Sequence, residues 1–92
     1  MDRILLVEDD RNTLEGLAEI LTMENYEVTK APDGRSALNE IKNSTFNVVL
    51  TDLVLPDIDG LELAKSIWKE ESDLMIVMMT AFGSVKNAVN AM

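Results

Sequence analysis

The sequence predicts an α/β domain in which helices cover both faces of a parallel sheet. Short apolar runs alternate with amphipathic stretches four times along the 92 residues. This alternation is typical of parallel strands joined by right-handed helical crossovers. The content of 47% hydrophobic and 27% charged residues is ordinary for a globular chain with one core. No linker or internal repeat interrupts the pattern, so residues 1–92 are interpreted as one domain.

Four segments are expected to form strands: residues 4–7, 26–30, 46–51 and 74–79. The first and last are apolar runs, and the third has the apolar centre Val-Val-Leu. Such runs are typical of strands that are covered on both faces.

Apolar side chains at helical spacing follow each predicted strand. Asp10 is interpreted as the cap of the first helix or as an outer group of a site, while Pro32, Gly34, Pro56 and Gly60 mark turns and loops. The apolar helical faces consist of Leu14, Leu17, Ala18 and Leu21, then Ala37, Leu38 and Ile41, then Leu61, Ala64, Ile67 and Trp68, and finally Val85, Ala88, Val89 and Met92.

The composition excludes several kinds of chemistry. The chain has neither cysteine nor histidine, so thiol, disulfide and imidazole chemistry are ruled out. The net charge of −9 argues against direct contact with nucleic acid, which needs clustered basic residues. No apolar run approaches the length of about 18 residues that suggests a membrane helix, and no signal peptide is evident. A cytoplasmic location is compatible with these features.

Polar residues occur where three of the predicted strands end. Glu8 and Asp9 follow the first strand, Asp52 follows the third, and Thr80 follows the fourth. In a doubly wound sheet, sites form at the carboxyl ends of strands. If these three strands are neighbours, the polar groups therefore converge. Each residue also has an ordinary structural explanation, as a helix cap or a turn residue, and only their common position favours a site.

The chemistry of such a site follows from its oxygen atoms. Three carboxylates at one place repel one another, and a divalent cation would relieve this repulsion. Oxygen ligands without histidine or cysteine select a hard ion, Mg²⁺ or Mn²⁺. A carboxylate beside such an ion can act as a nucleophile and form an acyl phosphate, and the Thr80 hydroxyl could donate to a phosphoryl oxygen.

Three segments carry a resemblance to a known family: residues 4–10, residues 51–60, with the form D-x-x-x-P-x-x-D-G, and residues 79–81. Together they resemble the receiver domain of two-component response regulators, and the resemblance covers essentially the whole chain. It implies a flavodoxin-like sheet with the strand order 2-1-3-4. It also implies a phosphoryl acceptor that is not an enzyme beyond self-phosphorylation and self-dephosphorylation, with a phosphohistidine of a sensor histidine kinase as the donor.

The same resemblance implies a role for individual residues. Asp52 would be the phosphorylated residue. Asp9, Asp52 and the backbone carbonyl of Val54 would bind Mg²⁺ directly, and Glu8 would bind it through water. Thr80 would be the switch hydroxyl, and Ala81 would leave access and supply a backbone N–H.

Residues 80–92 are similar to the nitrogen-regulatory branch of the family, whose members are transcription activators that work with sigma-54 polymerase. In that branch the receiver precedes an ATPase domain and a DNA-binding domain. Receivers usually also contain a fifth strand and helix and a lysine that contacts the phosphoryl group, and this sequence stops before them. We therefore expect weakened phosphorylation or switching, and self-association through the edge of the fourth strand, 74–79, and the fourth helix.

Three alternatives remain open at this point. A phosphatase with an aspartate nucleophile would need an acid two residues after Asp52, where this chain has Val54. A flavin or nucleotide binder would need a phosphate-binding loop after the first strand, where this chain is acidic. A receiver-like interaction module that no longer switches would share the fold without the chemistry.

Overall fold

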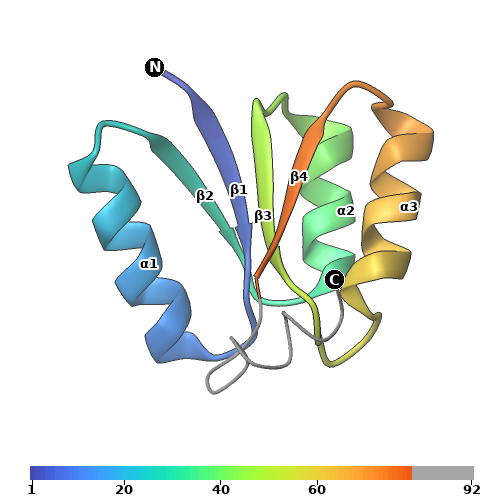
Figure 1. The fold of residues 1–92 in the computed structure, drawn as a ribbon, viewed down its shortest axis with the longest axis horizontal. Coiled ribbons are helices and arrows are strands. Elements are labelled where there is room, and N and C mark those ends of the chain that lie inside the picture. Colours follow the sequence, from blue (N-terminus) through green and yellow to red (C-terminus); the bar gives the residue numbers. More distant parts are fainter. Residues whose placement is uncertain (80–92) are drawn as a thin grey trace.

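The computed structural model describes residues 1–79, which form a four-stranded parallel sheet flanked by three helices (Figure 1). The strand order is β2-β1-β3-β4, which confirms the predicted order 2-1-3-4. The expected helix over residues 85–92 lies outside the described residues, as do Thr80 and Ala81. The elements are β1 (Arg3–Val7), α1 (Arg11–Met23), β2 (Glu27–Ala31), α2 (Gly34–Asn43), β3 (Val48–Asp52), α3 (Gly60–Glu70) and β4 (Met75–Met79).

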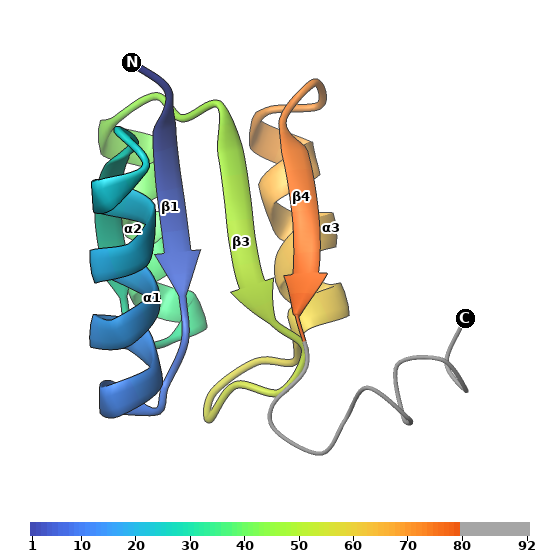
Figure 2. The same ribbon diagram turned by 60° about the vertical axis from the view of Figure 1, so that its left-hand side comes forward.

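Helices cover both faces of the sheet, with α1 on one face and α2 and α3 on the other (Figures 1 and 2). The alternation of side chains along β1 explains both layers. Leu5 and Val7 belong to the core beneath α2 and α3, whereas Leu6 packs with Leu14 and Ala18 of α1. Residues 4–7 of β1 are all buried, and they form the continuous apolar run that is typical of a central parallel strand.

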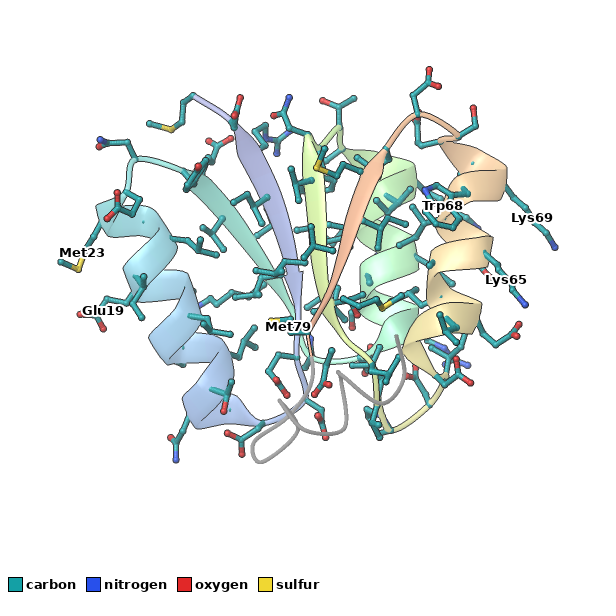
Figure 3. The ribbon with its side chains drawn as sticks, viewed as in Figure 1. Glu19, Met23, Lys65, Trp68, Lys69 and Met79 are labelled. Carbon is teal, nitrogen blue, oxygen red and sulfur yellow. The ribbon has the colours of Figure 1, made fainter. Side chains whose placement is uncertain are left out.

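The edge strand β4 is less well covered than β1. Met75 is 62% exposed and Val77 is 42% exposed, while Ile76 between them packs against the core beneath α2 and α3. On that side Trp68 of α3 lies near β4 (Figure 3), and its indole N–H donates a hydrogen bond of 2.9 Å to the carbonyl of Leu74. β4 therefore presents apolar side chains at the edge of the described sheet.

The predicted strand boundaries differ from the observed ones by one or two residues. The clearest case is the third strand, predicted as 46–51 and observed as Val48–Asp52. Asn47 precedes it and joins it to β1, because its side-chain oxygen accepts from the Arg3 N–H at 2.7 Å and its own N–H donates to the Arg3 carbonyl at 2.8 Å. At the other end of the strand, Asp52 is the last residue of β3 and not the first residue after it.

Each described helix is capped by the aspartate that directly precedes it. The side chains of Asp10, Asp33 and Asp59 accept hydrogen bonds from backbone N–H groups three residues later, at Thr13, Ser36 and Glu62. These caps satisfy amides that have no partner within the helix, and they confirm that Asp10 caps the first helix. No helix among the described residues is both long and apolar enough to span a bilayer.

Candidate functional site

Three acidic side chains meet at the carboxyl ends of β1 and β3. These strands are parallel neighbours, with Val7 paired to Thr51, so the residues that follow Val7 lie beside the end of β3. One carboxylate oxygen from each of Glu8, Asp9 and Asp52 lies within 4.8 Å of the other two. The prediction that residues 43 positions apart in sequence converge at one edge of the sheet is therefore confirmed for Asp9 and Asp52.

The three acids differ in their exposure to solvent. Glu8 is 5% exposed and Asp52 is 2% exposed, whereas Asp9 is exposed. Buried carboxylates are normally paired with a cation. Among residues 1–79, the ion pairs of Lys and Arg are made with other acids, at Glu15, Glu27 and Glu62. The cluster is therefore an uncompensated negative charge within the described part of the chain.

The protonation of Glu8 reflects this environment. Burial raises the pKa of Glu8 to about 7 from its ordinary 4.5, and the neighbouring Asp52 and Asp9 contribute in the same direction. The backbone N–H of Asp10 donates to Glu8 Oε2 at 2.9 Å and opposes this rise in pKa. The raised pKa means that negative charge is unfavourable at this position, and a bound cation would relieve it as a proton does. The cluster therefore fits a small hard ion with oxygen ligands.

Asp10 does not belong to the cluster. Its carboxylate accepts from both the N–H and the hydroxyl of Thr13, at 2.9 and 2.6 Å, and these hydrogen bonds hold the pKa of Asp10 below its ordinary value. Of the two interpretations of Asp10 made from the sequence, the helix cap is the one that the structure supports.

The segment after Asp52, residues 53–59, is termed the acceptor loop here. Its first residues are held against β3 and β4: the Leu53 N–H donates to the carbonyl of Met79 at 2.8 Å, and the Val54 N–H donates to Asp52 Oδ1 at 3.3 Å. Val54 thus lies beside Asp52, and the residue is 70% exposed.

Gly60 closes the acceptor loop. Its N–H donates to the carbonyl of Leu53 at 2.7 Å, and a Cβ atom at this position would lie 2.6 Å from the carbonyl oxygen of Asp52 and 2.8 Å from Leu53 Cα. Both contacts are with backbone, which cannot move away easily. Glycine is therefore required for the loop to fold back onto the end of β3.

Two further residues support the site, and the sequence analysis did not identify either of them. Thr51 is fully buried, and its hydroxyl donates to the carbonyl of Asp52 at 3.0 Å. Asp57 in the acceptor loop accepts hydrogen bonds from Gly34 and Arg35 at the start of α2. The contact of Asp57 joins residues more than 20 positions apart, so local sequence patterns contain no signal for it.

The predicted site residues fall into two groups. Glu8, Asp9, Asp52 and Val54 lie together at the end of β1 and β3. Thr80 and Ala81 lie outside the described residues; the last described residue of β4, Met79, is paired with Asp52.

Comparison with known proteins gives consistent results. The family model for the response regulator receiver domain matches residues 4–92. The response regulator receiver protein CpdR of Brucella abortus is 39% identical over 85 residues, covering 92% of this chain and 71% of CpdR. The regulatory protein AtoC of Escherichia coli is 32% identical over 92 residues, which are all of this chain but 20% of AtoC. Across AtoC and six other relatives, the chain spans 19–38% of each relative's length.

Solved structures of the response regulator TrrA from Thermotoga maritima have the same fold. The structure of TrrA with Mg²⁺ and BeF has a TM-score of 0.85 and 35% sequence identity, and the match covers 99% of this chain and 79% of TrrA. The structure of TrrA in complex with the histidine kinase ThkA has a TM-score of 0.84 and 38% identity, with 90% of this chain and 72% of the other covered.

Proposed function

The chain belongs to the response regulator receiver family, and from this membership we propose that Asp52 accepts a phosphoryl group from a sensor histidine kinase. The observation that carries the proposal is the convergence of Glu8, Asp9 and Asp52 within 4.8 Å. A nucleophilic carboxylate that is nearly buried beside two further acids is suited to phosphoryl transfer once its charge is balanced.

The residues present fit a divalent cation, and we assign Mg²⁺, with Mn²⁺ as the chemical equivalent. Asp9, Asp52 and the backbone carbonyl of Val54 would hold the ion directly, and Glu8 would hold it through water. When bound, the ion neutralises negative charge on the phosphoryl oxygens. Support comes from the oxygen-only ligand set and from the Mg²⁺–BeF complex of TrrA.

In the proposed reaction an Asp52 carboxylate oxygen forms a bond to phosphorus. The bond between phosphorus and the imidazole nitrogen of the kinase breaks, and its electron pair returns to that nitrogen. The Val54 N–H, which donates to Asp52 Oδ1, orients the carboxylate. Thr80 and Ala81 would donate to the phosphoryl oxygens through a hydroxyl and a backbone N–H. The product is an acyl phosphate on the protein itself, so this chain is a phosphoryl acceptor that acts once for each group received.

The kinase partner is supported by the complex of TrrA with the histidine kinase ThkA. We place the output in the regulation of transcription, in the cytoplasm. The resemblance of residues 80–92 to sigma-54 activators supports this output. A contact between copies of the chain through β4 is also proposed, because Met75 and Val77 are exposed at that edge. Light scattering over a wide concentration range tests that contact, and a monomer throughout would contradict it.

The decisive experiment is mass spectrometry of the chain after incubation with acetyl phosphate and Mg²⁺. We expect one phosphoryl adduct that is absent without Mg²⁺ and absent in Asp52→Asn. Glu19→Gln, which changes an exposed acid on α1 (Figure 3), is the matched control and should be modified normally. If the wild-type chain carried no adduct, or if Asp52→Asn carried the same one, the proposal would be wrong. A wild-type chain without an adduct would fit the alternative of an interaction module, whereas an adduct on Asp52→Asn would place the phosphoryl group on another residue.

A further inference from the structure

The tip of the acceptor loop is attached to the start of α2 by one side chain. Asp57 Oδ1 accepts from the Gly34 N–H, and Asp57 Oδ2 accepts from the Arg35 N–H, each at 2.9 Å. These bonds span 23 and 22 positions in the sequence. Because both oxygens are used on adjacent amides, the carboxylate is fixed in position and in orientation.

The start of α2 differs in this respect from the other described helix starts. At α1 and α3 the side-chain cap comes from the residue that directly precedes the helix, Asp10 or Asp59. α2 has such a cap as well, since Asp33 accepts from the Ser36 N–H at 2.8 Å. Asp57 is therefore a second, remote cap. Its bonds to α2 connect two parts of the molecule in addition to satisfying the helix.

Apolar contact reinforces this attachment. A Cβ atom on residue 34 would overlap Cγ2 of Ile58, so glycine at this position lets the loop tip pack closely against α2. Ile58 packs in turn against the core beneath α2 and α3. The two amides of α2 hold the pKa of Asp57 below its ordinary value, so the carboxylate that accepts them is charged at neutral pH.

The other end of the loop carries the chemistry. Leu53 is bonded to β4, and Val54 is bonded to Asp52. The loop is thus fixed at its base by β3 and β4 and at its tip by α2. Without the bonds of Asp57, residues 54–58 would be held only through the base, the closing Gly60, the packing of Ile58 and the burial of Leu55, which is 8% exposed.

We propose that Asp57 is a positioning residue that holds the acceptor loop against α2, so that the Val54 backbone is preorganised beside Asp52. The inference rests on the proposed function, because it takes Val54 as part of the cation site. Preorganised ligands bind more tightly, since less ordering is left to occur on binding. By linkage, cation binding at Asp52 stabilises the bonds between Asp57 and α2 to the same extent that those bonds favour the cation.

The test compares two aspartates at the same helix start. Asp57→Ala removes the remote cap, and Asp33→Ala removes the local cap without touching the acceptor loop. Isothermal titration with MgCl₂ should show the dissociation constant rising about tenfold in Asp57→Ala, a size typical of lost supporting contacts around metal ligands. Asp33→Ala should change it less than about twofold, because its bond lies within α2. Asp57→Asn, which keeps one acceptor oxygen, should fall between the wild type and Asp57→Ala.

Amide hydrogen exchange provides a readout that does not depend on function. In Asp57→Ala, exchange should accelerate at Val54 and through residues 57–58 as well as at Gly34 and Arg35, whereas Asp33→Ala should accelerate it only in α2. Saturating Mg²⁺ should slow exchange at Gly34 and Arg35 in the wild type.

Equal Mg²⁺ affinities for the Asp57→Ala and Asp33→Ala variants, or unchanged exchange at Val54 in Asp57→Ala, would overturn the positioning role. A wild-type chain that binds no Mg²⁺ would instead refute the proposed function. Exchange at Val54 would still decide whether Asp57 orders the loop.

Discussion

The two ends of the sheet differ in whether their charged side chains have partners of opposite charge. At the amino end the Arg3 side chain has three partners. Its Nε donates to Glu27 Oε2 at 2.7 Å, another guanidinium nitrogen donates to the Thr45 carbonyl at 2.7 Å, and the group lies 5.1 Å from the centre of the Phe46 ring. At the carboxyl end, Glu8 and Asp52 are buried without a basic partner among residues 1–79.

The difference separates a structural use of charge from a functional one. The amino end is complete within the described chain, and its ion pair lies at the surface, where such pairs contribute little. At the carboxyl end the buried acids have no neutralising partner among the described residues. Burying like charges side by side lowers stability unless something neutralises them. A bound cation would remove this repulsion. We therefore expect the contribution of the carboxyl end to stability, and not that of the amino end, to depend on cations and pH.

The largest expected effect is that of Mg²⁺ itself. At a concentration 100 times its dissociation constant, an ion that binds only the folded chain raises the free energy of unfolding by about 2.7 kcal/mol. Urea denaturation with and without MgCl₂ measures this change, with NaCl at equal ionic strength as the control. An equal effect of the two salts would remove the distinction between the two ends.

The second effect is a pH dependence caused by Glu8. Its pKa is about 7 in the folded chain and 4.5 ordinarily, so between these values the unfolded chain releases a proton that the folded chain keeps. Stability without Mg²⁺ should therefore fall as pH rises from 4.5 through 7, and then level off. Thermal unfolding across this range should show the decline, and Glu8→Gln should flatten it. A decline unchanged in Glu8→Gln would assign it to other groups.

A smaller effect is expected for Asp52→Asn, and its sign should depend on the cation. Without Mg²⁺ at pH 8 the substitution removes one of three converging charges, so the free energy of unfolding should rise by about 1 kcal/mol. With saturating Mg²⁺ it should fall below that of the wild type, because a ligand is lost. Glu19→Gln should change stability little in either condition. If Asp52→Asn changed the free energy of unfolding in the same direction with and without Mg²⁺, Asp52 would not belong to a cation site.

The smallest effect is expected at the amino end. Arg3→Ala removes a partly exposed ion pair with Glu27 and should lower the free energy of unfolding by about 0.5 kcal/mol. The loss should be the same with and without Mg²⁺ and at pH 5 and pH 8. Arg3→Lys keeps the charge but not the planar group, so its free energy of unfolding should lie between those of the wild type and Arg3→Ala. A loss that varied with Mg²⁺ would show that the two ends are coupled.

Local patterns were sufficient to predict most of the fold. Apolar runs such as Leu5 to Val7 identify buried parallel strands, and aspartates such as Asp10 identify helix starts, because both signals arise from neighbouring residues. The boundary at Val48 could not be predicted, because the apolar Phe46 extends the strand pattern in sequence, while the hydrogen bond between Asn47 and Arg3 joins residues 44 positions apart.

The candidate site was predictable to the extent that strand order was. Asp9 and Asp52 lie at strand ends in the sequence, and their convergence required only that β1 and β3 be neighbours, which the resemblance to receivers supplied. The position of Asp57 was not predictable in this way, because its partners in α2 are set by how the acceptor loop crosses the sheet edge. Thr80 and Ala81 stay predictions.

The pairing of Val7 with Thr51 also determines where this chain tolerates changes in length. Deleting Val49 from β3 would send every following side chain of that strand to the opposite face, and would put the polar Thr51 in the position of Leu50. It would also shift Asp52 along the strand, away from Asp9. Insertions are far less damaging in the turn between α3 and β4, at residues 71–74, which lies at the other end of the sheet. Homologous chains should therefore vary in length at that turn while β1 and β3 keep a constant number of residues.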